Sequence, residues 1–255
     1  MALAIERGIE TSILEVNSTL LGKPGTVVET IILSDQNPLH VGWLDKFSMQ
    51  RLVSDVRRAR EFQDAPILRV SEGYSWGVMR LSGSPRPDFK DRLYKLELAA
   101  RKAMKFKRDA GAAKASICGA VQELVDNIFE HSEKANSGIV VFLGDSESFE
   151  IAIGDSGIGV LASLRTNKAY SFLTDSASAL SFALTDGHSR FGREAGRGNG
   201  FSTLFRALRS LDAELRFRSG NCALELADRG PRLDRAHASQ KAFLQGFVVT
   251  LRLRF

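Results

Sequence analysis

Two apolar runs in the middle of the chain, SGIVVFLG (137–144) and SFEIAIGDS (148–156), constrain the fold most strongly. Both are rich in the β-branched and aromatic residues typical of strands, and only the polar turn DSES separates them. So short a connection predicts an antiparallel hairpin. Three more strands are expected near the C-terminus, in AELRFRSG, NCALELA and QGFVVTLRLRF, the last with alternating apolar residues. The sequence therefore predicts an antiparallel sheet.

Helical patterns accompany these strands. Apolar residues recur at helical spacing through 86–111, a second helix is expected over 112–134, and GFSTLFRALRSL (200–211) is strongly helical. The segment SASALSFAL (176–184) also has the composition of a helix. Helices that cluster with an antiparallel sheet predict an α+β fold of two layers.

The segment SGSPRP at 82–87 divides the chain, because Ser, Gly and Pro interrupt regular structure. We therefore expect a small α/β region over 1–85, without recognisable chemistry, and a larger domain over 86–255. Within the first region the expected order is strand, helix, strand, over TVVETIILS (26–34), LDKFSMQRLVSDVRRAREF (44–62) and APILRV (65–70).

Composition limits the class of protein. The 255 residues are 44 % hydrophobic, which is ample for a globular core. No apolar run approaches the roughly 20 residues of a membrane span, and MALAIERGIE lacks the features of a signal peptide, so a cytoplasmic location and no membrane partner are expected. Cys118 and Cys222 are far apart, which favours buried thiols over a disulfide framework or a zinc site.

The net charge of +5 permits contact with nucleic acid or acidic partners but does not require it. Much of the excess lies in 86–111. A solvated helix face explains that segment, and a surface for an anionic partner is the alternative.

The stretch ELVDNIFEHS (123–132) carries the first polar motif. Glu123, Asn127 and His131 are spaced by four, so on a helix they form one line. The apolar residues between them need a core. Taken alone, a solvated outer face explains the polar line.

Two glycine motifs follow. In IAIGDSGIG (151–159) an apolar strand ends at Asp155, and Gly157 and Gly159 let the backbone turn sharply beside this carboxylate. An Asp can accept a hydrogen bond from an amino group, and glycines let a flat ring approach the main chain. An ordinary turn explains this motif equally well by itself.

In AGRGNGF (195–201), Gly196, Gly198 and Gly200 precede a helix N-terminus, a place suited to phosphate. A plain loop before a helix is the alternative. The motif is neither a Walker sequence nor a dinucleotide fingerprint. Nearby cations that could reach a triphosphate are His188, Arg190, Arg193 and Arg197, of which Arg197 lies inside the motif.

Together, ELVDN (123–127), DSGIG (155–159) and GRGNG (196–200) resemble the N, G1 and G2 boxes of the GHKL superfamily, which includes gyrase, the heat-shock chaperone, histidine kinases and MutL. The resemblance covers about residues 112–255. It implies the Bergerat fold, a sandwich of an antiparallel or mixed sheet and helices, with ATP bound between the helices and a mobile lid.

The resemblance also implies roles for individual residues. Asp155 would accept the adenine amino group, with Gly157 and Gly159 shaping the base pocket, and Asn127 would ligate Mg²⁺. Glu123 stands where ATPase members keep the general base. The residues that would wrap the phosphates are Gly196, Arg197, Gly198 and Gly200. Asp126 and Glu130 are expected on the surface, and a packing or capping role is expected for His131.

The residues that follow the histidines indicate which branch of the superfamily the chain resembles. A sensor kinase has a phosphoacceptor His that an acidic residue usually follows, whereas Val, Ser, Ser and Ala follow the histidines of this chain, His40, His131, His188 and His237. Gyrase and MutL need a following domain that supplies a lysine, so we expect that branch less, because the sequence ends with its last expected strand, unless a partner supplies the missing group. The chain therefore resembles most the stand-alone histidine-kinase-like ATP-binding proteins, including the anti-sigma-factor serine kinases.

Two functions are compatible with that resemblance. One is an Mg-ATP-dependent ATPase or protein serine/threonine kinase with Glu123 as its general base. The alternative is an ATP-gated regulatory module with little turnover, which closes residues 160–195 over the nucleotide. Both imply a regulatory protein partner, which the sequence does not identify.

Overall fold

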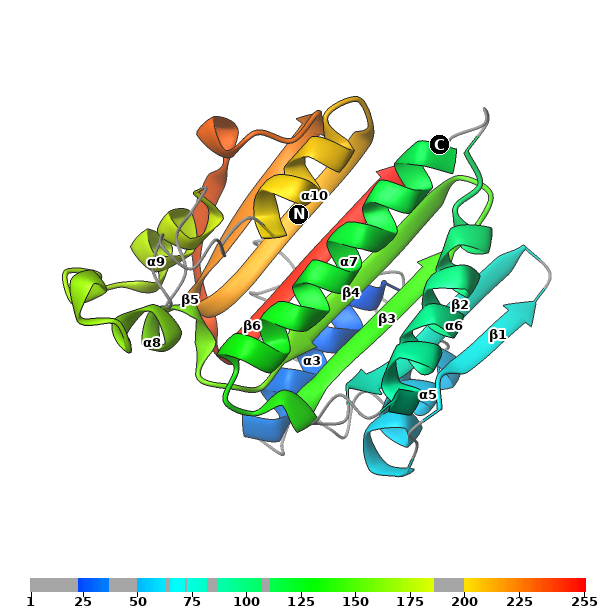
Figure 1. Cartoon of the computed structure of the whole chain (residues 1–255), viewed down its shortest axis with the longest axis horizontal. Coiled ribbons are helices and arrows are strands. Elements are labelled where there is room, and N and C mark those ends of the chain that lie inside the picture. Colours follow the sequence, from blue (N-terminus) through cyan, green and yellow to red (C-terminus); the bar gives the residue numbers. More distant parts are fainter. Residues whose placement is uncertain are drawn as a thin grey trace.

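The computed structural model describes residues 23–36, 50–62, 65–71, 73–81, 87–106, 111–185 and 200–255. In this part, six strands form one antiparallel sheet in the order β1-β2-β3-β4-β6-β5 (Figure 1). The strands are β1 (Ile67–Ser71), β2 (Tyr74–Leu81), β3 (Gly138–Gly144), β4 (Ser148–Asp155), β5 (Asp212–Arg229) and β6 (His237–Arg254). With the helices that accompany the sheet, the predicted α+β class is confirmed.

Helices cover both faces of the sheet (Figure 1). The helices of one face are α6 (Pro87–Ala103), α7 (Gly111–His131) and α10 (Gly200–Leu208). The helices of the second face are α3 (Pro24–Gln36) and α5 (Gln50–Phe62). Near β5 lie α8 (Gly159–Arg165) and α9 (Ser176–Leu184), and short 3-10 turns occur at η2 (Ala135–Ser137), η3 (Lys168–Tyr170) and η5 (Leu233–Arg235). None of the helices in the described ranges combines the length and the apolar character that crossing a membrane requires.

The largest core lies between the sheet and the layer of α6, α7 and α10. The apolar positions of the ELVDNIFEHS stretch supply part of it, since Leu124, Val125 and Ile128 are buried. The hairpin prediction is also confirmed, because β3 and β4 pair with Val141 opposite Ala152. Cys118 and Cys222 are buried, free thiols, as expected.

The N-terminal region shares the sheet of the larger domain. Strand β2, which the sequence did not reveal, pairs along its length with β3, and β1 pairs with β2. The expected strand at APILRV corresponds to β1, and the expected helix over 44–62 is described from Gln50 as α5. The strands predicted on either side of the SGSPRP break therefore belong to one sheet.

The prediction for TVVETIILS (26–34) is wrong, because this segment lies within helix α3. Its residues Val27 to Leu33 are buried, and α3 packs on β3, β4 and β6 in the apolar core to which α5 also contributes. A short apolar run enriched in β-branched residues fits a buried strand or a buried helix equally well. The overlooked signal is Pro24 at the first helical position, where its missing N–H costs nothing.

The prediction of three C-terminal strands is also wrong, because AELRFRSG and NCALELA form a single long strand, β5. Its pairing with β6 shifts in register between Ser219 and Cys222, at Gly220. A glycine inside a strand often marks such a bulge rather than the end of the strand. This bulge matters because it lies beside the DSGIG turn.

Candidate functional site

Asp155 lies at the end of β4 and is 3 % exposed. Its Oδ1 accepts a hydrogen bond from the backbone N–H of Gly157 at 2.8 Å. Burial raises the pKa of Asp155 to about 7, because the hydrogen bond from Gly157 offsets only part of the desolvation. Among the described residues, no cationic side chain forms an ion pair with this carboxylate. Asp155 is therefore a buried acceptor whose desolvation the described part of the fold does not balance.

The two glycines of the DSGIG turn are required by close contacts. A Cβ on Gly157 would lie 2.1 Å from the carbonyl oxygen of Ser132, just beyond α7. Gly159 has φ +77°, in the left-handed region, and a Cβ there would lie 2.9 Å from Ser219 Oγ. The backbone N–H of Ile158 donates to the Ser132 carbonyl at 3.0 Å. The turn is thus fixed against the C-terminal end of α7.

Serines that sequence reasoning missed hold the same turn. Ser219 Oγ accepts from the Val160 N–H at 3.0 Å and donates to the Gly246 carbonyl at 2.7 Å. Gly246 has φ +108°, and a Cβ there would lie 1.9 Å from the Asp155 carbonyl oxygen. On the other side, the Ser156 N–H donates to Ser137 Oγ at 2.9 Å. The available signal was the pair of glycines inside the C-terminal strands, which marks a bulge or a close approach.

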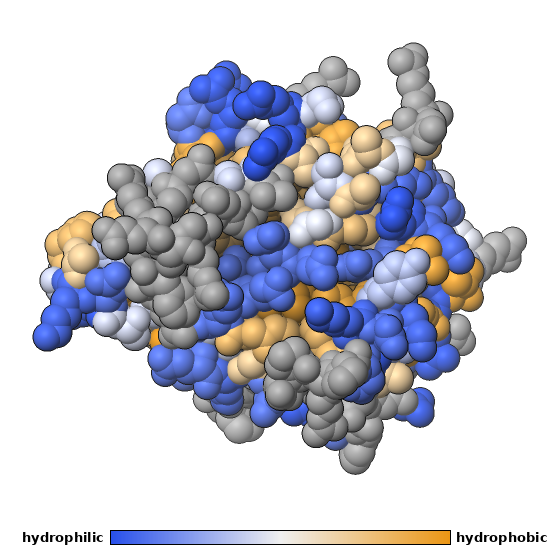
Figure 2. Space-filling view, viewed as in Figure 1, coloured by the Kyte–Doolittle hydropathy of each residue, from blue (hydrophilic) through white to orange (hydrophobic). Residues whose placement is uncertain are grey.

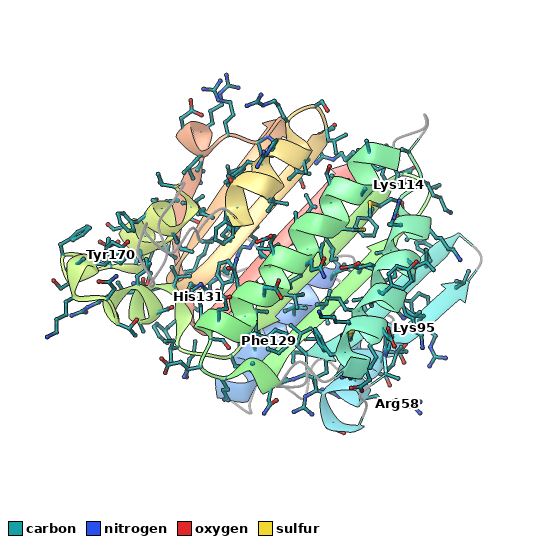
Figure 3. The ribbon with its side chains drawn as sticks, viewed as in Figure 1. Arg58, Lys95, Lys114, Phe129, His131 and Tyr170 are labelled. Carbon is teal, nitrogen blue, oxygen red and sulfur yellow. The ribbon has the colours of Figure 1, made fainter. Side chains whose placement is uncertain are left out.

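Helix α7 presents different residues on its two flanks. Phe129 faces α6, since its ring lies 5.1 Å from that of Phe89 in an edge-to-face arrangement. Residues two before and two after it point to the opposite flank, so Asn127 and His131 face the side of α10, which packs against α7. Hydrophilic residues follow the exposed side of α7 (Figure 2), and Phe129 and His131 project from its end on different sides (Figure 3).

Glu123 and Asn127 are accessible along this flank. Glu123 is exposed and Asn127 is half-buried. Within the described part of the chain, neither side chain has a hydrogen bond or an ion pair. Asp126 is also exposed, as predicted, and burial together with the neighbouring charges of Glu123 and Glu130 raises its pKa. Glu130 is half-buried and lies 3.9 Å from His131 Nε2.

The third motif is described only from Gly200, the first residue of α10. The predicted residues Gly196, Arg197 and Gly198 lie outside the described residues, as do His188, Arg190 and Arg193. The ring of Phe201 contacts the ring of Phe247 with centroids 6.2 Å apart. Phe247 is in turn the β6 partner of Asp155 in the sheet register. The start of α10 therefore lies near the base of the DSGIG turn.

The described residues of all three motifs thus come from adjoining elements. Ser132 joins the end of α7 to the DSGIG turn, and Phe247 joins the start of α10 to the strand that carries Asp155. A buried acceptor beside a turn without side chains can accept a hydrogen bond from an amino group on the edge of a flat ring. Within the described ranges no group of three or more His, Cys, Asp or Glu residues could hold a metal ion.

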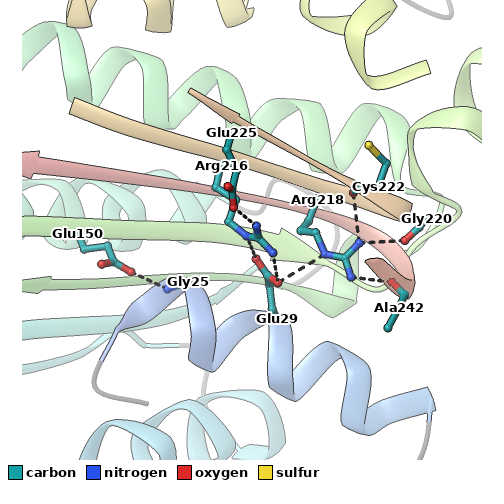
Figure 4. A network of polar contacts seen from close by, with 9 residues as sticks. All are labelled: Gly25, Glu29, Glu150, Arg216, Arg218, Gly220, Cys222, Glu225 and Ala242. Atoms are coloured by element: carbon teal, nitrogen blue, oxygen red, sulfur yellow. Dashed lines mark hydrogen bonds and ion pairs between the residues drawn. The ribbon is translucent and has the colours of Figure 1, made fainter. Parts of the chain in front are cut away.

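The second face of the sheet holds a different polar cluster (Figure 4). Glu29 of α3 accepts from Arg216 Nε at 2.7 Å and lies 3.6 Å from Arg218 Nε. Arg216 also contacts Glu225. The fully buried Arg218 donates to the carbonyl oxygens of Gly220, Cys222 and Ala242. This cluster ties α3 to the β5 bulge.

Comparisons with known proteins add no family to this description, since no family model and no curated protein matches the chain.

Proposed function

We propose that this chain binds Mg-ATP in the manner of histidine-kinase-like proteins and uses it for slow hydrolysis or for phosphoryl transfer to a protein hydroxyl. The observation that carries the proposal is Asp155, buried at the end of β4 with its pKa raised to about 7. Desolvated carboxylates without a balancing cation are characteristic of functional sites, where a ligand supplies the missing partner.

Adenine is the ligand group that fits this carboxylate. Its exocyclic amino group would donate to Asp155, and that hydrogen bond would offset the desolvation of the acid. Gly157 supports the same interaction from the other side, because its N–H holds Oδ1 at 2.8 Å and thereby fixes the orientation of the carboxylate. The absence of side chains on Gly157 and Gly159 keeps the turn narrow enough to approach the ring.

The phosphates would lie toward α7 and the start of α10. The N-terminus of α10 at Gly200 offers backbone N–H groups and the positive end of a helix dipole. Asn127 offers an amide oxygen of the kind that hard cations take as a ligand, so it would hold Mg²⁺ together with phosphate oxygens. When bound, Mg²⁺ neutralises charge on the phosphates during transfer.

Glu123 would act as the general base. It precedes Asn127 by one helical turn on the flank toward α10, so both would face the terminal phosphate. Its carboxylate would take the proton from a water or from a Ser/Thr hydroxyl, whose oxygen attacks the γ-phosphorus as ADP leaves.

An ATP-gated regulatory module with little turnover is the second candidate. The exposure of Glu123 favours it, because no described residue holds this side chain in a fixed orientation. A base that is free to rotate contributes less to a transfer step than one that is held in position. In that case closure over bound ATP would be the functional event.

Calorimetric titration with Mg-ATP tests the proposal. We expect saturable binding by the wild type and a loss of at least about 100-fold in affinity in Asp155→Asn, since the amide would present an N–H₂ or a weaker acceptor to the adenine. Asp91→Asn, an exposed acid on α6, is the matched control and should bind normally. Tight binding by Asp155→Asn would mean that the base pocket is elsewhere.

Turnover separates the two candidates. With γ-labelled ATP and cell extract, the enzyme hypothesis predicts label on free phosphate or on another protein, and a drop of about 100-fold or more in Glu123→Ala with binding retained. Equal, near-zero label in wild type and Glu123→Ala, with binding intact, would favour the module.

A further inference from the structure

A groove of about 1110 Å³ lies beside α10. Its walls are α10, the end of α9 and the turn between β5 and η5. Hydrophilic residues gather over this part of the surface in Figure 2. Of the described residues that line the groove, none is assigned to nucleotide binding.

The groove is a built feature of the fold. The backbone N–H of Gly230 donates to the carbonyl of Leu211 at 3.1 Å. Gly230 has φ +68°, and a Cβ on it would lie 2.4 Å from the Arg209 carbonyl oxygen. The turn therefore lies directly against the end of α10, at a spacing that only glycine permits.

Two arginines give the groove its charge. Arg206 lies in the last turn of α10, and Arg209 follows the helix directly. Both are exposed, and neither forms an ion pair with another described residue. Arg232, by contrast, donates to Asp234 from two nitrogens, at 2.9 and 2.7 Å. The excess positive charge therefore comes from Arg206 and Arg209.

The floor of the groove is apolar. Leu184 is buried beneath it, and Phe205 and Leu233 are half-buried along it. Apolar side chains below a rim of two guanidinium groups fit a peptide that carries both carboxylates and aliphatic residues. Single-stranded nucleic acid fits less well, because the Phe205 ring packs against the Phe217 ring, with centroids 6.4 Å apart, and is not free to stack on bases.

We propose that this groove docks an acidic segment of a partner protein, with its carboxylates on Arg206 and Arg209 and an aliphatic side chain over Phe205. Arg206 lies about 9 Å along α10 from Gly200, at 1.5 Å of rise per residue. A docked partner is thus held beside the helix whose N-terminus we assign to phosphate. Docking itself uses none of the nucleotide residues, so it stands or falls separately from the proposed function.

Fluorescence anisotropy with the full chain tests the docking. The probe is a fluorescein-labelled peptide with three repeats of Glu-Leu-Asp-Ser, measured without nucleotide. We expect saturable binding, weakened at least tenfold by Arg206→Glu/Arg209→Glu and by high salt. The matched control, Arg58→Glu/Arg101→Glu, reverses two exposed arginines on other helices and should bind the peptide as the wild type does.

Three results would overturn the proposal. The first is equal loss of binding in both double variants, which would indicate a general charge effect. The second is unchanged affinity when Gln and Asn replace the acids of the peptide. The third is binding of a 20-nucleotide polyuridine probe that is tighter than binding of the peptide and is weakened by Arg206→Glu/Arg209→Glu. Circular dichroism checks the fold, and Arg206→Gln/Arg209→Gln replaces the reversal variant if that one is unfolded.

Discussion

Two buried carboxylates lie on opposite sides of the sheet and differ in the groups that balance their charge. Glu29 of α3 and Asp155 of β4 are each 3 % exposed. Glu29 meets the guanidinium groups of Arg216 and Arg218, whereas the donor that reaches Asp155 in the described part of the chain is the N–H of Gly157. One charge is balanced by side chains of the fold, and the other is not.

The pKa shifts of these two acids follow from their partners. Burial pushes the pKa of Glu29 upward, but Arg216 and Arg218 outweigh it, so the net pKa lies below the ordinary value. Burial raises the pKa of Asp155 to about 7, since one backbone hydrogen bond compensates only in part. We infer that the ion pairs of Glu29 stabilise the fold. We propose that Asp155 instead binds a ligand.

The largest effect is expected when Glu29 loses its charge. Glu29→Gln leaves Arg218 buried without its carboxylate and should lower the free energy of unfolding by about 3 to 5 kcal/mol. Denaturant unfolding followed by circular dichroism measures it. Glu147→Gln, an exposed acid in the β3–β4 turn, should change the free energy by less than about 0.5 kcal/mol.

A double variant sharpens this result. In Glu29→Gln/Arg218→Met the uncompensated cation is also gone, so part of the lost stability should return. If the two substitutions were simply additive, Glu29 and Arg218 would not be coupled, and the comparison with Asp155 would lose its basis.

The next effect concerns the pH dependence of Asp155. Its carboxyl binds a proton more tightly in the folded chain than in the unfolded one, so its contribution to stability is present at low pH and is lost as pH rises through about 7. Between pH 5 and pH 8 the free energy of unfolding of the wild type should fall by about 2 to 3 kcal/mol relative to that of Asp155→Asn, in which the side chain at this position does not titrate. A stability difference that is constant with pH would mean that Asp155 has an ordinary pKa in the folded chain.

The sequence predicts a segment correctly where its local pattern fits only one type of structure. The β3–β4 hairpin follows from two apolar runs and a turn, and α7 follows from its apolar spacing. Asp155, Gly157 and Gly159 were predicted as a sharp turn with a carboxylate, and the contacts of Gly157 with Ser132 explain why a side chain is excluded there. These features depend on residues close together in the chain.

The rest depends on contacts between distant residues. TVVETIILS forms a helix whose apolar residues pack on β3, β4 and β6, and its composition does not distinguish this helix from a buried strand. Ser219 and Gly246 support the DSGIG turn from 59 or more residues away, through a bulge that looked like the end of a strand. The pairing of Glu29 with Arg216 spans 187 residues. No local pattern carries such information.

A smaller effect is expected from a methyl group at Gly157, which tests how tightly the turn holds Asp155. In Gly157→Ala the Cβ would lie 2.1 Å from a backbone oxygen, so the turn must shift, at a cost of about 1 to 3 kcal/mol. The donor to Asp155 shifts with it, and Mg-ATP affinity should fall. Gly119→Ala in α7 meets nothing within 4 Å and should instead stabilise by about 0.5 to 1 kcal/mol.

The smallest effect is expected at a third buried carboxylate. This residue distinguishes the effect of ion pairing on stability from the effect of burial alone. Glu150 is 7 % exposed, and its Oε1 accepts from the Gly25 N–H in the first turn of α3 at 2.9 Å. Burial raises its pKa despite Gly25, Lys23 and Arg252. Glu150→Gln keeps an acceptor for the N–H of Gly25 and removes a charge that burial disfavours. The free energy of unfolding should therefore change by less than about 1 kcal/mol. If Glu150→Gln cost as much as Glu29→Gln, burial of any acid would explain both losses, and the arginines beside Glu29 would no longer distinguish it.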